Sequence, residues 1–369
     1  MVQNSSGELK PEREHTLDIC RGLAVAGVVL VHMLSGLIDA NVITDASKAD
    51  RINDVLSLMR MPALALLLGV LVPGSVSRRG SMGYLRRRLP LLLWLFILWS
   101  FIQGAIEVFT SGSKNQPTTW QDVYTLWTPE DQMWFLPYLI VATIVMVAGR
   151  PWEPGRRGHL TLFLCLIASV LMWSRNFPYI ATTGIALIGF SALGTRIPLR
   201  RVSYLSSARS LVVLPVTVIA VTCVCLIAWK SSAQGPTVGR HGLSFLVILY
   251  SAFGTACGIA ALFGLAVLLS RITQTGRLLT ALGQRTLQIY LAHITFYAGI
   301  RVVLLKLGVD NVALHIALGL SAGIAGPIAL GYFSKYVHAG WLFALPKFNS
   351  SRTAAEERHI RADSASNSV

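Results

Sequence analysis

The sequence predicts an all-α integral membrane protein with about ten transmembrane helices and with both termini in the cytoplasm. Three observations predict this fold: an apolar composition, recurring apolar runs of about twenty residues, and basic clusters between alternate runs. Hydrophobic residues make up 53% of the 369 residues and charged residues only 13%, whereas soluble domains contain about 25% charged residues. A bilayer accommodates this much continuous apolar surface, and the core of a soluble protein does not.

The apolar runs give the expected positions of the transmembrane helices. They cover residues 19–40, 54–72, 89–109, 133–149, 160–174, 178–194, 210–229, 243–270, 286–306 and 312–333. With the N-terminus in the cytoplasm, this arrangement places most of the 32 basic residues on the cytoplasmic side. One transmembrane helix more or fewer would move the later basic clusters to the wrong side, so the positive-inside rule supports this number.

The chain is expected to form one membrane domain with short polar ends. Residues 1–16 are polar and hold no apolar core before a cleavage site, which predicts a cytoplasmic N-terminus. Residues 17–348 are expected to form a single ten-helix domain, and the tail at 349–369 is expected to be disordered and cytoplasmic. The longest external segment, 110–132, is too short for a separate domain.

The net charge of +15 first suggests a nucleic-acid partner. The basic residues lie in short clusters between apolar runs, however, and no zinc-finger or helix-turn-helix pattern accompanies them. We therefore expect membrane lipid rather than nucleic acid as a partner. The five cysteines fall in apolar stretches, which predicts free buried thiols, no disulfides and no metal site.

The first apolar run carries a polar stripe. Arg21 and His32 are eleven residues apart, which is three helical turns plus about 20°, so both lie on one face. His32 then lies about 16 Å above Arg21, near the middle of a hydrocarbon core about 30 Å thick. A neutral imidazole at that depth suits a general base, and a guanidinium at the membrane surface suits a phosphorylated ligand. Asp18, three residues before Arg21, is placed to orient it.

A second polar stripe lies on the run at 286–306. Thr286, Tyr290, His293 and Tyr297 share one helical face, which could line the same cavity and bind an acceptor. Each stripe also has a structural interpretation. His32 could be a buried packing residue, Arg21 a topology signal, and the second stripe a hydrogen-bonded seam between helices.

Four motifs in order resemble the membrane acyltransferase 3 family. The opening is Leu17-Asp18-x-x-Arg21-Gly22 followed by His32, which matches the family's basic residue, ten residues, then histidine. The others are Met61-Pro62 with Gly69, then Trp134-Phe135-Leu136, and finally Leu282-Gly283 with Tyr290 and His293. The chain departs from the family at Leu68, at Arg60, and at Arg86, Arg87 and Arg88, which replace a spaced arginine pair.

The resemblance implies an O-acyltransferase of the cell membrane, with no appended extracytoplasmic SGNH-type domain and no bound cofactor. The implied donor is cytoplasmic acyl-CoA, with acetyl-CoA expected, and the implied acceptor is a glycan, glycolipid or small secondary metabolite. By resemblance and chemistry, His32 is the expected catalytic base. The other expected binding residues are Arg21, Asp18, Arg86, Arg87, Arg88, Arg60, Trp134, Tyr290 and His293.

Several alternatives remain open at this point. The three consecutive arginines are also explained by membrane topology, and Trp134 is also explained as an anchor at the membrane surface. A transporter or flippase of a lipid-linked sugar would share the basic loops and the polar cavity, although the sequence shows no internal repeat. A non-catalytic scaffold would not need two polar stripes. The oligomeric state is not indicated.

Overall fold

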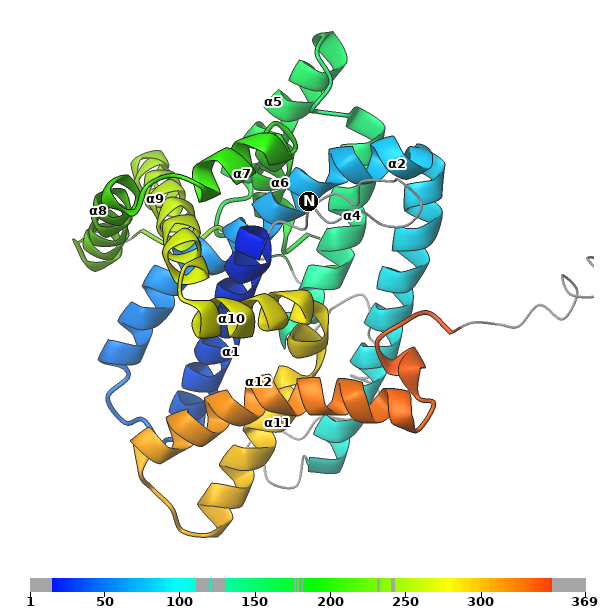
Figure 1. Ribbon diagram of the computed structural model, residues 1–369. Coiled ribbons are helices and arrows are strands. Elements are labelled where there is room, and N and C mark those ends of the chain that lie inside the picture. The colour runs from blue at the N-terminus through cyan, green and yellow to red at the C-terminus, as the bar shows by residue number, and fades with distance from the viewer. Residues whose placement is uncertain are drawn as a thin grey trace, which may run out of the picture.

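The computed structural model describes residues 15–110, 120, 131–175, 177, 179–180, 182–230, 233–239 and 243–346. These residues are mostly helical and contain no strand, which confirms the all-α prediction (Figure 1). The helices are α1 (His15–Asp39), α2 (Ser47–Thr110), α4 (Phe135–Gly149), α5 (Arg156–Leu171), α6 (Ile188–Thr195), α7 (Leu199–Ser206), α8 (Ser210–Lys230), α9 (Phe245–Ser270), α10 (Thr273–Gln284), α11 (Thr286–Lys306) and α12 (Val312–Tyr336). The tail expected at 349–369 and residues 1–14 of the expected polar N-terminus lie outside the described residues.

Within the described residues, seven helical stretches are long and apolar enough to cross a membrane. They comprise α1, α2, residues Gln132–Gly149 around α4, and α8, α9, α11 and α12. The protein is therefore a multi-pass membrane protein. The prediction of about ten crossings with cytoplasmic termini stays a prediction.

The longest helix, α2, contains two of the expected membrane crossings and a break between them. Gly80 has φ 69° and ψ 162°, a non-helical conformation that falls in the region where only glycine is unstrained. The break lies between the predicted runs at 54–72 and 89–109, and the basic segment predicted as a loop is helical on either side of Gly80. Figure 1 shows the chain changing direction between the two halves of α2.

The prediction of a helix over 178–194 is wrong in its extent. Of the residues that the structure describes in this range, only a short 3₁₀ turn (Ile185–Leu187) and α6 are helical. The hydroxyl of Thr182 donates hydrogen bonds to the carbonyl oxygens of Phe177 and Tyr179, which stabilises a turn in competition with a helix. Gly184 then packs directly against the ring of Tyr138 on α4. Helix α5 packs against the shortened α6.

Two helices occupy segments predicted as loops. Helices α7 and α10 are short and polar on one side, so they lack the apolar length that marks a membrane crossing. Helix α10 packs closely on the N-terminal half of α1. This close contact needs Gly22, because a side chain there would overlap the carbonyl oxygen of Leu279.

Helix α1 lies inside the helical bundle. It contacts α2, α9, α10, α11 and α12, and Ala24 and Val29 are fully buried (Figure 1). Asp18 is buried on this helix, and Arg21 and His32 are partly buried. The positions of Asp18, Arg21 and His32 on α1 thus place them between packed helices.

Small residues bring α2 and α6 together beside this centre. A side chain at Gly69 would overlap the carbonyl oxygen of Ser191, and one at Gly194 would overlap that of Leu66. The Ser191 hydroxyl donates to the Ala65 carbonyl oxygen at 3.0 Å and lies 2.6 Å from the hydroxyl of Tyr138. The glycine of the second motif therefore has a packing role.

Candidate active site

The two predicted stripes meet at a pair of histidines. The ring centroids of His32 on α1 and His293 on α11 are 5.3 Å apart, with an angle of 57° between the rings. His293 is completely buried, whereas His32 keeps some accessible surface. The structure thus brings together two residues that lie 261 positions apart, as expected if both stripes line one site.

The hydrogen bonds of His293 define its tautomer. Its Nδ1 lies 2.8 Å from the carbonyl oxygen of Tyr290 and 3.1 Å from that of Ile289. Because carbonyl oxygens only accept, Nδ1 carries the proton, an assignment made from the hydrogen-bond network. The opposite atom, Nε2, is buried and has no hydrogen-bond partner among the described residues. His293 therefore presents a free lone pair inside the protein.

Arg60 adds a positive charge close to this pair. It lies on α2 opposite Gly27 of α1, where an added Cβ would be 3.9 Å from the Arg60 Cβ. The Arg60 side chain lies near both His32 and His293. Its Nε and Nη1 atoms are buried and make no hydrogen bond to a described residue. Buried N–H groups without partners are costly, so these two donors are expected to meet an anion or a developing negative charge.

An aromatic cluster borders the histidines. The Phe135 ring on α4 lies 5.4 Å from the Tyr290 ring and 5.6 Å from the Trp134 ring, measured between centroids. The Tyr290 ring lies 6.2 Å from His293. Phe135 rather than Trp134 therefore makes the contact between the tryptophan motif and the residues at the centre. Such a wall keeps water from the reacting groups.

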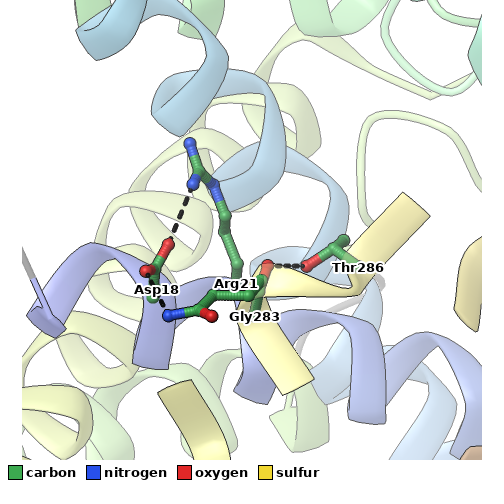
Figure 2. A network of polar contacts seen from close by, with 5 residues as sticks. Asp18, Arg21, Gly283 and Thr286 are labelled. Atoms are coloured by element: carbon green, nitrogen blue, oxygen red, sulfur yellow. Dashed lines mark hydrogen bonds and ion pairs between the residues drawn. The ribbon is translucent and has the colours of Figure 1, made fainter. Parts of the chain in front are cut away.

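The second group of predicted residues lies at the N-terminal end of α1. Arg21 Nη1 forms an ion pair with Asp18 Oδ1 at 3.2 Å, and the two side chains are 24% and 3% exposed. Gln284 of α10 donates to the other Asp18 oxygen at 3.5 Å. Figure 2 shows Asp18, Arg21, Gly283 and Thr286 gathered where α1 meets the end of α10. The expected contact between Asp18 and Arg21 is present, and the role of this pair in donor binding stays a prediction.

Gly283 makes this arrangement possible. A Cβ at Gly283 would overlap the carbonyl group of Asp18, so only glycine allows the two helices to approach this closely. The Thr286 hydroxyl donates to the Gly283 carbonyl oxygen at 2.7 Å and so helps to fix the end of α10. The glycine of the last motif therefore holds α10 against α1.

Replacing Gly283 with alanine is expected to destabilise the protein by about 1–3 kcal/mol, because backbone atoms must move apart to admit the methyl group. Thermal unfolding of the purified protein in lipid nanodiscs measures the effect. Gly299→Ala on α11 is the matched control, because no atom lies within 4 Å of a Cβ there. Equal unfolding temperatures for Gly283→Ala, Gly299→Ala and the unmodified protein would contradict the packing role.

Three of the predicted donor-binding residues are consecutive arginines on α2. Arg86 and Arg87 are exposed on α2 beyond the break at Gly80, and Arg88 is partly buried with an unpartnered Nε. Their expected contact with a donor phosphate stays a prediction.

One polar residue of this region was missed by the sequence analysis. Arg301 of α11 donates from Nη1 to the Gly36 carbonyl oxygen on α1, one turn beyond His32. Arg301 is four residues after Tyr297, so it continues the stripe of Thr286, Tyr290 and His293. A charged residue on the polar face of an apolar run was the signal available in the sequence.

The described residues contain no group of three His, Cys, Asp or Glu side chains that could hold a metal ion. Among the groups at this site, His32 and His293 offer proton transfer, and Arg60 offers hydrogen bonds to a negative charge.

A family model described as an acyltransferase domain matches residues 14–332. Comparison with curated proteins and with solved structures found no match to the chain. Because the matched region covers most of the chain, the protein belongs to the membrane acyltransferase 3 family and is a membrane acyltransferase.

Proposed function

We propose that the protein transfers an acyl group, in particular acetyl, from cytoplasmic acyl-CoA to a hydroxyl group. The proposed acceptor is a cell-envelope glycan, a glycolipid or a secondary metabolite, and the proposed location is the cell membrane. The proposed topology has about ten crossings and cytoplasmic termini, which puts Arg21 on the side where acyl-CoA is found. The observation that carries the proposal is the contact between His32 and His293, with two buried donors of Arg60 that have no partner among the described residues.

In the proposed reaction the acceptor oxygen attacks the thioester carbonyl carbon, and His32 takes the hydroxyl proton. The carbonyl oxygen becomes an oxyanion, for which Arg60 offers N–H groups in a site shielded from water. The C–S bond then breaks, and the proton returns from His32 to the departing thiolate. The products are an ester and free coenzyme A, so no other reactant is consumed.

His293 is proposed to position the acceptor. Its Nδ1 proton is bound by backbone carbonyl oxygens, so its free Nε2 can accept a hydrogen bond from a second hydroxyl of the acceptor. Tyr290 and Phe135 supply aromatic surface beside it. Sugars and other polyols carry neighbouring hydroxyl groups, which fits this combination of one base and one acceptor nitrogen.

The proposal predicts that deletion of the gene removes acyl esters from the acceptor. Mass spectrometry of envelope glycans, glycolipids and metabolites is expected to show species heavier by one acyl group in cells with the gene, and none in the deletion strain. Mild alkali should remove the added mass, because esters hydrolyse under conditions in which amides persist.

Complementation with the intact gene is the control and should restore the same species. Loss of a surface glycan in the deletion strain, with unchanged acylation of the glycan that remains inside the cell, would contradict the proposal and support the transporter alternative. Identical ester content in all strains would also contradict it.

A further inference from the structure

A polar cavity lies apart from the two histidines. It has a volume of about 280 Å³ and lies between the corner that joins α10 to α11 and the last two turns of α12. Its polar lining comes from Gln284, Arg285, Gln288, Tyr332 and Lys335. Gln288 is five residues before His293, which places it about 140° away around α11. The cavity therefore opens on a different side of α11 from the proposed active site.

The side chains of this cavity are suited to an anion. Arg285 donates from Nη2 to the Tyr332 hydroxyl, and its guanidinium lies 5.2 Å from the centre of the Tyr332 ring. Its Nη1 donates to the Ala281 carbonyl oxygen at 3.1 Å, so the guanidinium is held in place. Lys335 is exposed on α12, one turn after Tyr332. None of the described lining residues is acidic.

Gly331 leaves room for a further donor. A Cβ at Gly331 would lie 2.9 Å from the amide group of Gln288, so glycine allows this amide to rest against α12. Two positive charges and two amide groups thus surround one cavity. Phosphate groups, with several acceptor oxygens and a negative charge, match such a set of donors.

The surroundings of the cavity favour a lipid as the source of the phosphate. Next to it, α12 exposes Tyr332, Phe333 and Tyr336, which are 57%, 60% and 83% accessible. Aromatic residues of this kind gather at the surface of a membrane, where the headgroups lie. Basic pockets between transmembrane helices are a known way of binding anionic headgroups.

We propose that this cavity binds the phosphodiester group of an anionic membrane lipid. Arg285 and Lys335 pair with the phosphate oxygens, Gln288 donates a further hydrogen bond, and the acyl chains follow the aromatic surface of α12. Gln284 lines the cavity and also donates to Asp18, which pairs with Arg21. A bound headgroup therefore stabilises the α10–α11 corner that packs against α1.

Thermal unfolding and native mass spectrometry test this site in the purified full-length protein. Nanodiscs of phosphatidylcholine alone are compared with nanodiscs that contain phosphatidylglycerol. The unmodified protein should retain phosphatidylglycerol and unfold at a higher temperature in its presence. Arg285→Gln and Lys335→Gln should each weaken phosphatidylglycerol binding about fivefold.

Arg277→Gln is the matched control, because Arg277 is exposed on α10, carries the same charge and does not line the cavity. Lys335→Gln keeps the test valid if Arg285→Gln fails to fold, since Lys335 is an exposed residue. An equal loss of binding in Arg277→Gln would overturn the proposal in favour of general surface attraction. Retention of phosphatidylglycerol by both cavity variants at the unmodified level would overturn it as well.

Inorganic phosphate and acetyl-CoA, added separately to phosphatidylcholine nanodiscs, distinguish a lipid from a soluble phosphate ester. Neither compound should raise the unfolding temperature in a way that depends on Arg285 and Lys335. An increase that these two variants abolish would overturn the lipid assignment. The result does not depend on acyl transfer, because none of these measurements reads the enzymatic activity.

Discussion

Replacing His32 with alanine is expected to lower the rate of acyl transfer by about 10²–10⁴-fold, the range that a positioned general base contributes. His32 is the residue of the histidine pair that keeps some accessible surface, which favours it over His293 as the base. The ester content of the acceptor, measured by mass spectrometry at equal amounts of membrane protein, gives the result.

The control for this variant is His159→Ala. His159 is exposed on α5, where its Nδ1 lies 2.7 Å from the Gly155 carbonyl oxygen, far from the histidine pair in the sequence. A correctly inserted His32→Ala protein with full acylation would exclude His32 as the base. If His293→Ala lost all activity in that case, the base would instead be His293, whose free Nε2 is available for a proton.

Replacing Arg60 with glutamine is expected to lower the turnover number about 10²–10³-fold, because hydrogen bonds to a developing oxyanion are lost. The Michaelis constant for the donor should change less, since these hydrogen bonds strengthen only as the negative charge forms. Arg60→Lys keeps the charge but loses the planar group of donors, so it is expected to restore only part of the rate. Steady-state kinetics with purified protein in nanodiscs separates the two constants.

A purely structural role for Arg60 would have a different signature. If Arg60 acts on the oxyanion, Arg60→Met should unfold at the same or a higher temperature while it loses activity, because removing a buried charge without a partner does not cost stability. Arg196→Gln is the matched control. Arg196 also has buried guanidinium nitrogens without partners, but it lies at the C-terminal end of α6. A lower unfolding temperature for Arg60→Met, with turnover preserved in the folded fraction, would exclude the oxyanion role.

Most of the membrane helices could be predicted from the sequence, because an apolar run of about twenty residues is a local property. The expected run at 210–229 corresponds to α8 (Ser210–Lys230), and the run at 286–306 to α11 (Thr286–Lys306). The prediction of a helix over 178–194 was wrong because the segment is apolar, while the Thr182 side chain stabilises a turn within it. Helix α10 was missed because it is too short and too polar to be recognised as a membrane helix.

The residues of the candidate site were also predicted only in part from the sequence. Helical spacing places Arg21 and His32 on one face and aligns Tyr290 with His293, since a fixed angle per residue relates positions on one helix. A charge inside an apolar run was enough to single out Arg60. The sequence analysis did not extend the second stripe to Arg301, although the same spacing holds there.

By itself, then, the sequence determined the all-helical membrane class and the two polar stripes, because both depend on residues close together along the chain. Only the tertiary structure decided that His32 meets His293, that Arg60 lies near both, and that Gln284 reaches Asp18. These contacts join α1 to other helices, and the contact of Gln284 with Asp18 depends on the close approach of α10 to α1 that Gly22 and Gly283 allow. Such contacts follow from packing between helices, which the periodicity of a single helix does not specify.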